Sequence, residues 1–339
     1  MDAKIIDVAA KAGVSPATVS RVLNQGSSVT AKTRNKVMKA IDELNYRPNA
    51  AAKNLRLQKS LSIGVIAQDI NNAYFTEIIK GIENMAYARK YKVFICDAEN
   101  QAEKERDYLS LLMDRTMDGV IMITPQLSDE EIYGVVDKGY HIAVIGRNVN
   151  HPKIPCIYTD NVKFSRHVVE HLVEFGHRDI VFLSGYPEAV DSYERLEGYL
   201  KALKDNHIPF RPELVENGDF NETGGYEAIE RLFAKKMTFT AVFAANDEMA
   251  LGVYRACEER GIAIPEQLAV VGVDNNRISK YLTPRLSTVN QPKYTMGAII
   301  VEKLIDQMNE NQFEDKRVFT VDSELLVRAS SNYHIQKKK

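Results

Sequence analysis

A short segment near the start of the chain holds residues that could contact duplex DNA. Ser15 and Pro16 are typical of a helix start, because the serine hydroxyl can accept hydrogen bonds from free amides and proline has no amide to leave unpaired. Gly13 permits a tight turn before them, and the guanidinium of Arg21 on the following helix can bond bidentately to guanine. This spacing predicts a helix-turn-helix.

An alanine-rich stretch further along predicts a second DNA contact. Residues 46–56 are too few to form a stable helix alone. Two such segments side by side on DNA could fold together, and Leu55 could then wedge between base steps in the minor groove. A plain interdomain linker is the alternative. The predicted DNA-binding residues are Ser15, Pro16, Ala17, Thr18, Ser20, Arg21, Asn24, Lys53, Leu55 and Arg56.

The charge of the chain is divided unevenly. The first 59 residues carry eleven Lys and Arg against four Asp and Glu, a net of +7, while the remaining 280 carry 33 against 42, a net of −9. A basic N-terminal part is expected to attract a polyanion with an affinity that depends on salt. The acidic part, residues 60–339, is not expected to bind the polyanion.

A second set of polar residues follows the apolar runs of that acidic part. In open parallel sheets a ligand binds beyond the carboxyl ends of the strands, so polar residues placed just after each strand are candidates for a small-molecule site. Carboxylates, amides and guanidiniums together can satisfy the hydroxyls of a sugar. The residues in such positions are Asp69, Arg147, Asp160, Asn246, Asp247 and Asp274.

The elements that must position these residues are read from alternating short apolar runs and amphipathic stretches. Runs that are apolar on both faces predict buried parallel sheets of right-handed βαβ units. The expected strands are Ser62–Ile66, Val93–Cys96, Gly119–Ile123, Ile142–Ile145, Ile180–Leu183, Ala241–Ala244 and Leu268–Val273. The expected helices near 74–90, 103–115, 128–138, 193–206, 222–236 and 246–260 lie between them. The fold class is therefore an all-α helix-turn-helix headpiece plus an α/β core of two parallel-sheet lobes.

Other features exclude several classes of protein. Three cysteines without CxxC spacing argue against a disulfide or metal framework, and no cofactor is expected. No apolar run approaches the roughly eighteen residues that a membrane span needs, and the N-terminus lacks an apolar signal region. We therefore expect a cytoplasmic, nucleoid-associated protein. Nucleophile-elbow, Walker and dinucleotide-binding motifs are missing, which leaves a sugar-processing enzyme using Asp160 and Asp274 as a remote alternative.

The headpiece motif closely resembles that of the lactose-repressor (LacI/GalR) family. The resemblance is carried by residues 7–22, by Tyr46-Arg47-Pro48-Asn49 and Leu55, and by later blocks at 244–252 and 271–275. It implies a sequence-specific DNA-binding transcriptional repressor, of a carbohydrate-utilisation operon, that binds a pseudo-palindromic operator as a homodimer. It also implies a small effector, a sugar or sugar phosphate, held between lobes like those of periplasmic sugar-binding proteins, acting as inducer or as corepressor.

The same resemblance assigns residues to the effector site. Tyr74 and Phe75 match an effector-contacting turn, and Phe220 matches a stacking aromatic. The full set implied by the resemblance and by the strand-end positions is Asp69, Tyr74, Phe75, Arg147, Asp160, Arg195, Phe220, Asn246, Asp274 and Gln291.

The expected domain boundaries follow from both lines of reasoning. They are a headpiece at 1–46, a hinge segment or helix at 47–60, a first lobe at 61–160 plus 291–317, a second lobe at 161–290 plus 318–333, and a basic tail at 334–339.

The pattern from Ser15 to Arg21 is closest to the branch of catabolite control proteins, which are activated by a phosphorylated carrier protein. In that branch the helix after residues 291–294 carries an arginine suited to the partner's phosphate, whereas this chain has Glu302 there. A carboxylate repels phosphate, although the adjacent Lys303 could partly compensate. Activation by such a carrier is therefore the alternative to control by a small effector.

Overall fold

The computed structural model describes residues 3–23, 29–46, 59–309 and 317–333. The chain divides into two compact units, residues 1–60 and 61–339, and each is described by itself. The predicted hinge residues Lys53, Leu55 and Arg56, together with Asn24 and the basic tail, lie outside the described residues.

The headpiece contains three helices around a small apolar core. These are α1 (Ile5–Ala12), α2 (Pro16–Leu23) and α3 (Ala31–Glu43). The helix start predicted at Ser15 is confirmed, because the amide of Thr18 donates to Ser15 Oγ at 3.2 Å. Gly13 ends α1 with a φ of 65°, a left-handed conformation that favours glycine. The core residues are Val8, Ala9, Ala12, Val19, Val22, Val37 and Ala40.

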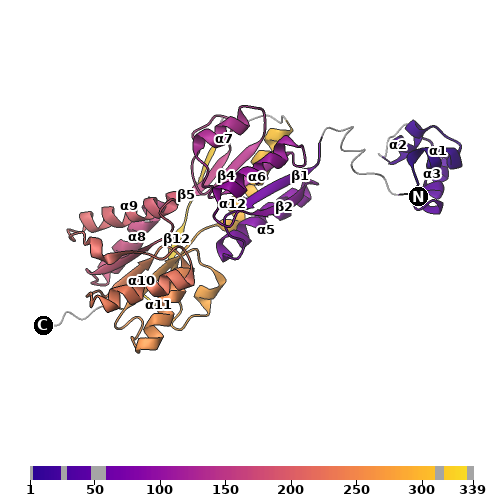
Figure 1. The fold of residues 1–339 in the computed structure, drawn as a ribbon. Coiled ribbons are helices and arrows are strands. Elements are labelled where there is room, and N and C mark those ends of the chain that lie inside the picture. The colour runs from indigo at the N-terminus through magenta and orange to yellow at the C-terminus, as the bar shows by residue number, and fades with distance from the viewer. Residues whose placement is uncertain (1–2, 24–28, 47–58, 310–316, 334–339) are drawn as a thin grey trace. The chain divides into compact units, whose positions relative to one another are not determined.

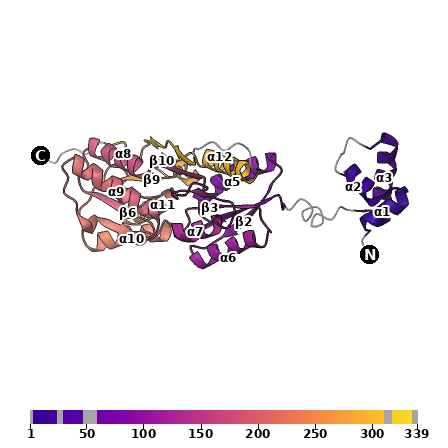
Figure 2. The same ribbon diagram turned by 90° about the horizontal axis from the view of Figure 1, so that it is seen from above.

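The first lobe is a parallel six-stranded sheet in the order β11-β5-β4-β3-β1-β2. Its elements are β1 (Ser62–Ala67), α5 (Ala73–Ala88), β2 (Lys92–Asp97), α6 (Ala102–Met113), β3 (Gly119–Ile123), α7 (Asp129–Val136), β4 (Ile142–Ile145), β5 (Cys156–Thr159), α12 (Lys293–Met308) and β11 (Val318–Val321). Figure 2 shows α5 and α12 on one side of this sheet and α6 and α7 on the other. Two apolar clusters, one on each face of the sheet, form its core.

The second lobe has the sheet order β12-β10-β9-β8-β6-β7, with every pair parallel except β10 and β12. Its elements are α8 (Asn161–Glu174), β6 (Ile180–Ser184), α9 (Val190–Asp205), η1 (Pro212–Leu214), β7 (Val215–Asn217), α10 (Glu222–Ala234), β8 (Ala241–Ala244), α11 (Asp247–Arg260), β9 (Ala269–Val273), η2 (Arg277–Lys280), β10 (Ser287–Asn290) and β12 (Glu324–Leu326). Figure 1 shows the two lobes with α8 to α11 around the second sheet.

The chain passes between the lobes three times. It leaves the first sheet after β5, returns to the first lobe with α12, and crosses again between β11 and β12. The expectation that residues 318–333 belong wholly to the second lobe is wrong for Val318–Val321, because this strand pairs with β5 in the first sheet. The last crossing therefore lies between Val321 and Glu324.

Candidate functional site

The second helix of the headpiece presents its predicted DNA-contacting residues on one face. Ser15, Pro16, Ala17 and Arg21 are exposed, and Thr18 and Ser20 are half-buried, while Val19 and Val22 fill the core. The helix therefore separates a packed apolar face from an accessible face that carries a guanidinium. This is the arrangement that a recognition helix needs to lie in a major groove.

The core contains a cavity of about 900 Å³ between the lobes, at the carboxyl ends of strands from both sheets. Eight predicted effector residues line it: Asp69, Tyr74, Phe75, Arg147, Arg195, Phe220, Asn246 and Asp274. The lining mixes aromatic rings with a few polar groups, as small-molecule sites do.

Two predicted effector residues do not line the cavity. Asp160 is exposed and caps α8, where its carboxylate accepts a hydrogen bond from the amide of Lys163 at 2.8 Å. Gln291 is buried behind the cavity, accepting from Thr159 Oγ1 at 2.8 Å and donating to Asp274 Oδ1 at 2.8 Å. Gln291 therefore positions a cavity residue instead of facing a ligand.

Asp274 is the most constrained of the cavity residues. It follows β9 with a φ of 106°, a conformation that costs free energy for any residue other than glycine and persists only where its surroundings hold it. Its side chain is 3% exposed. Burial raises the pKa of the Asp274 carboxyl to about 6, although the positive charges of Lys293 and Arg195 act in the opposite direction.

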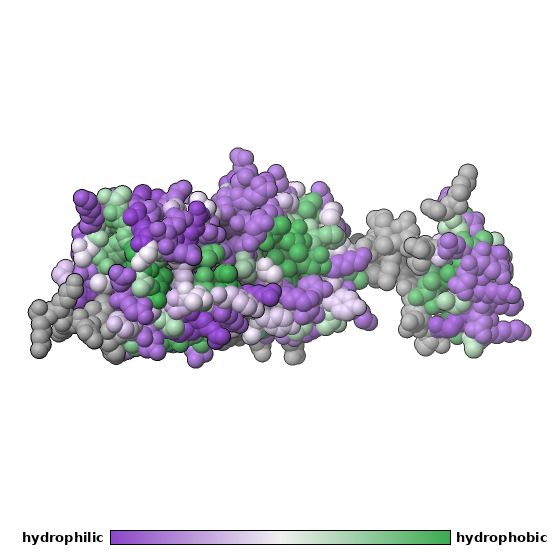
Figure 3. Space-filling model, turned by 90° about the horizontal axis from the view of Figure 1, so that it is seen from below, coloured by the Kyte–Doolittle hydropathy of each residue, from purple (hydrophilic) through white to green (hydrophobic). Residues whose placement is uncertain are grey.

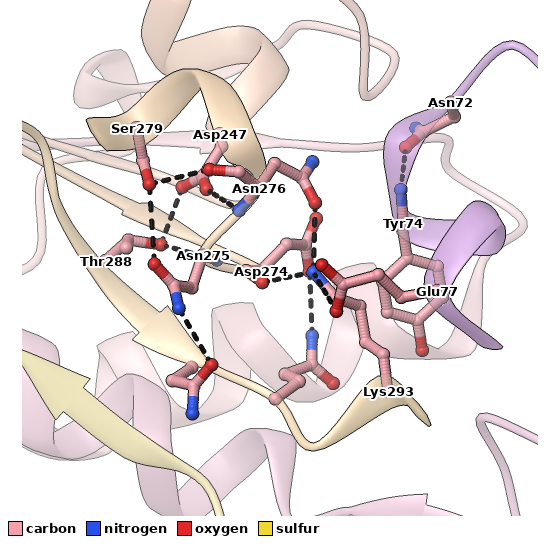
Figure 4. Close-up of polar contacts among 12 residues, drawn as sticks. Asn72, Tyr74, Glu77, Asp247, Asp274, Asn275, Asn276, Ser279, Thr288 and Lys293 are labelled. Atoms are coloured by element: carbon pink, nitrogen blue, oxygen red, sulfur yellow. Dashed lines mark hydrogen bonds and ion pairs between the residues drawn. The ribbon is translucent and has the colours of Figure 1, made fainter. Parts of the chain in front are cut away.

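Lys293 supplies a buried cation behind Asp274. This lysine begins α12 of the first lobe, yet its ammonium donates to the backbone carbonyl of Asp274 and to Asn276 Oδ1, at 3.0 Å from the latter. Glu77 of α5 lies 3.8 Å from the ammonium (Figure 4). The side chain of Lys293 is 1% exposed. It therefore bonds the first lobe to the loop that carries Asp274.

A second buried carboxylate, Asp247, fixes the same loop through Asn276. It accepts hydrogen bonds from the amide of Asn276 at 2.7 Å and from Thr288 Oγ1 at 2.6 Å (Figure 4). Burial, with the nearby charge of Asp274, raises the pKa of Asp247 well above its usual value. Asp247 was expected to follow a strand near the site, and the structure gives it a supporting position with no place in the cavity lining.

Arg195 is held in the second lobe by protein groups. Its Nε donates to Asn161 Oδ1 at 2.9 Å, and its Nη2 lies 3.2 Å from Asp191 Oδ2 on the same helix. The guanidinium carbon lies 5.6 Å from the centroid of the Phe220 ring and 5.5 Å from that of Phe164. These contacts place a charged group and an aromatic face together at one wall of the cavity.

The loop carrying Phe220 is fixed by Asn246. The Asn246 side chain caps α11 by accepting from the amide of Met249 at 2.9 Å, and it donates to the carbonyl of Phe220 at 2.8 Å. A Cβ added at Gly185 would lie 1.9 Å from the Phe220 ring, so only glycine leaves room for this ring. Asn246 therefore supports the loop of Phe220 as well as lining the cavity.

The first lobe contributes a turn, a capped helix and a paired arginine. Asn72 caps α5 by accepting from the amide of Tyr74 at 2.9 Å, and the rings of Tyr74 and Phe75 pack edge to face, 5.3 Å apart. Burial raises the pKa of the Tyr74 hydroxyl, so it is a neutral donor. Arg147 pairs with Asp129 beside the cavity.

Sequence reasoning missed several residues at the site. Asn100 of the first lobe donates to the hydroxyl of Tyr186 in the second at 3.1 Å, and both line the cavity. Asp191 could have been found from its spacing of four residues before Arg195 on a helix. Lys293 gave no signal, because a lysine in the first turn of a helix is ordinarily exposed.

Within the described ranges, no three His, Cys, Asp or Glu side chains are grouped as the ligands of a metal ion would be. In the same part of the chain, every helix is too short or too polar to cross a bilayer.

Comparisons with known proteins agree with this architecture. The lacI family of bacterial regulatory proteins matches residues 4–49, and the periplasmic binding protein-like domain matches residues 169–331. Catabolite control protein A of Priestia megaterium is 33% identical over 327 residues, covering 96% of each chain. The HTH-type transcriptional repressor PurR of Pectobacterium carotovorum subsp. carotovorum (strain PC1) is 36% identical over 330 residues, covering 97% of this chain and 96% of that one. The crystal structure of the lac repressor dimer bound to operator and the anti-inducer ONPF is similar with a TM-score of 0.88 and 30% identity, covering 98% of this chain and 99% of that one.

Proposed function

The chain belongs to the LacI family of DNA-binding transcriptional repressors, and from this premise we propose that it represses a carbohydrate-utilisation operon under the control of a sugar-like effector bound between the lobes. The observation that carries the proposal is the cavity itself. Its aromatic rings and buried hydrogen-bonding groups lie at the carboxyl ends of both sheets, in a chain that also carries a helix-turn-helix.

The proposed mechanism is linkage between the two sites. An effector that binds one arrangement of the lobes more tightly than another changes the population of the form that binds the operator. An inducer favours the form that releases DNA, and a corepressor favours the form that binds it. Asn100 with Tyr186, and Lys293 with Asn276, are contacts that differ between such arrangements because each joins the two lobes.

The test is an operator selection followed by a binding titration. The full chain is used to select duplexes from a randomised library, and affinity for the enriched sequence is measured by fluorescence anisotropy with and without a panel of sugars. We expect enrichment of a pseudo-palindrome and a change in affinity of at least about fivefold with one sugar, which corresponds to the lower range of allosteric coupling. Failure to enrich any duplex would contradict the proposal.

We also propose that the repressor is a homodimer in which edge strand β2 takes part. Phe94 and Ile95 of this strand are 45% and 54% exposed, and Tyr87 at the end of α5 is 79% exposed. Figure 3 shows hydrophobic residues gathered into patches on one face of the core. Exposed apolar patches and an uncovered edge strand are typical of an interface. The lac repressor structure named above is itself a dimer.

Light scattering of the variant Ile95→Glu tests the dimer. A buried charge opposite its symmetry mate costs several kcal/mol, so we expect dissociation to a monomer and at least about a hundredfold loss of operator affinity. The matched control is Ile70→Glu, since Ile70 is 46% exposed on a loop rather than on the edge strand. A dimer that survives Ile95→Glu unchanged would remove β2 from the interface.

The alternative, activation by a phosphorylated carrier protein, is not favoured by the surface of α12. Arg89 at the end of α5 is bonded to Glu302 at 2.6 Å and to Asp306 at 3.3 Å, so its charge is already balanced by two carboxylates. A phosphate arriving there would have to compete with both. Control by a small effector is therefore the proposal that we retain.

A further inference from the structure

The balance of charge around the cavity narrows the class of effector. Among the described residues that line it, four carboxylates stand against two guanidiniums, and none is a lysine. The carboxylates belong to Asp69, Glu188, Asp191 and Asp274. An anionic ligand would need a guanidinium whose positive charge is not already balanced by a carboxylate of the protein.

Both guanidiniums are already paired with carboxylates of the protein. Arg147 forms an ion pair with Asp129 and donates to the carbonyl of Leu127 at 2.7 Å. Arg195 lies 3.2 Å from Asp191 and also donates to Asn161. Each can still donate a hydrogen bond to a hydroxyl, but neither leaves a net positive charge to a ligand.

The buried lysine nearest the cavity is used in the same way. Lys293 lies behind Asp274 and outside the cavity lining, where its ammonium is surrounded by the Asp274 carbonyl, Asn276 Oδ1 and Glu77 (Figure 4). It compensates the carboxylates of its own network, those of Asp274 and Asp247. Lys293, like Arg147 and Arg195, therefore has no net positive charge to offer an anionic ligand.

Two carboxylates at the cavity remain uncompensated. Asp69 accepts hydrogen bonds from the amide and side chain of Asn71, both in its own loop. Glu188 is exposed in the loop after β6. Within the described part of the chain, no cation lies within 4.0 Å of either carboxylate. An anionic group on the ligand would be repelled by both charges, and more strongly by the half-buried Asp69 than by the exposed Glu188, because water screens exposed charges.

The remaining lining suits an uncharged ring with hydroxyls. The rings of Tyr74, Phe75, Tyr186 and Phe220 offer apolar faces. Asp274 Oδ1 is taken by Gln291, which leaves the other carboxylate oxygen to accept a hydrogen bond from a ligand. Aromatic faces and acceptor groups together recognise C–H surfaces and hydroxyl donors.

We propose that the effector is an uncharged polyhydroxylated ring, a neutral sugar, and that the cavity rejects the phosphate ester of the same sugar. The inference rests on the proposed function, because it takes the cavity to be the effector site. Of the two effector classes expected from the resemblance, a sugar or a sugar phosphate, it selects the sugar.

The test uses matched pairs of ligands on the full chain. The pairs are glucose with glucose 6-phosphate, galactose with galactose 6-phosphate, ribose with ribose 5-phosphate, and cellobiose with cellobiose 6′-phosphate, with inorganic phosphate as a separate probe. Thermal shift identifies binders and calorimetry measures the affinity of each. We expect one neutral sugar to bind, its ester to bind at least about tenfold more weakly, and phosphate to produce no shift.

A pair of variants tests the cause of the discrimination. Asp69→Asn combined with Glu188→Gln removes the two uncompensated charges while keeping the side-chain shapes, so the preference for the sugar over its ester is expected to fall at least about threefold. The control is Glu266→Gln, which removes one exposed charge before β9, at the end of the strand opposite to Asp274. The control should leave the preference unchanged.

The outcomes separate this inference from the proposed function. An ester that binds more tightly than its parent sugar overturns the inference, and if it also changes operator affinity the proposed function stands. A panel in which nothing binds overturns the inference as well. A charge-removed double variant with the same preference as the unchanged chain overturns the electrostatic explanation on which the inference depends. Failure of the operator selection is the separate result that would end the proposed function.

Discussion

The two lobes share one fold but hold their cavity residues differently. In the second lobe Arg195, Asn246 and Asp274 are at most 4% exposed, and each is bonded to protein groups from outside its own loop. In the first lobe Asp69 is half-buried and is bonded only to Asn71 of its own loop among the described residues. The second lobe is therefore a preorganised surface for a ligand, while the loop of Asp69 is a less constrained part of the first-lobe wall.

The largest expected effect concerns the residue that joins the two lobes. Lys293→Met removes a buried cation from a network that holds Asp247 and Asp274, and removing one partner of a buried charged network typically costs about 3–5 kcal/mol. We expect the free energy of unfolding in urea to fall by about 3 kcal/mol or more.

The matched control for this variant is Lys163→Met. Lys163 is 59% exposed and lies 3.6 Å from Asp322, so its replacement should change stability by less than about 0.5 kcal/mol. Equal effects of the two substitutions would show that the buried ammonium is not needed to balance the carboxylates.

The next effect compares one carboxylate from each lobe. Asp274→Asn removes a charged acceptor from the preorganised surface, which should weaken effector binding by about 1.5–3 kcal/mol. Asp69→Asn removes a less constrained one and should change affinity by less than about threefold. Calorimetry with the identified sugar measures both. Equal losses would mean that the lobes contribute alike.

The helix caps that flank the cavity give a smaller contrast. Asn72→Ala removes the cap of α5 and should lower the free energy of unfolding by about 1 kcal/mol. Asn246→Ala removes the cap of α11 together with the bond to the Phe220 carbonyl, so about 2 kcal/mol is expected. Urea denaturation of both variants measures the difference, and a cost at Asn72 equal to that at Asn246 would contradict the role given to the Phe220 loop.

The smallest effect expected on effector binding comes from the titration of Asp274. The pKa of Asp274 in the folded protein is about 6, above the usual carboxyl range. At pH values between that range and about 6, Asp274 is therefore protonated in the folded state and ionised in the unfolded state. Stability from this group therefore falls as the pH rises through that window. Effector affinity should change oppositely, by about fourfold between roughly pH 5.5 and pH 7, because the ionised carboxylate accepts the sugar hydroxyl. Both dependences should be missing in Asp274→Asn.

Much of the fold could be predicted because periodic patterns report burial directly. The strands expected at Gly119–Ile123, Ile142–Ile145 and Ala241–Ala244 have the observed bounds. The prediction missed β5, β7 and β10 to β12, which are three or four residues long, too short for alternation to stand out. The helices expected from periodicity also omit α8 and α12. The pairing of α12 with α5 depends on contacts between segments about 200 residues apart.

The position of a residue just after a strand correctly predicted several of the side chains that line the cavity. It failed where a side chain bonds to nearby protein groups and turns away from the cavity. Asp160 follows β5 just as Asp274 follows β9, yet Asp160 turns back to cap the helix that begins beside it. Gln291 points at Asp274 from behind because the chain crosses between lobes there. Neither direction is encoded in residue type.

The late return of the chain to the first lobe has a consequence for synthesis on the ribosome. Met296, Ile300, Val301 and Leu304 of α12 complete the core of the first lobe, and β11 completes its sheet, so this lobe cannot close until residues near 321 have emerged. The helix-turn-helix needs only the first 46 or so residues. A nascent or truncated chain therefore possesses its DNA-reading part long before it possesses the part that senses the effector.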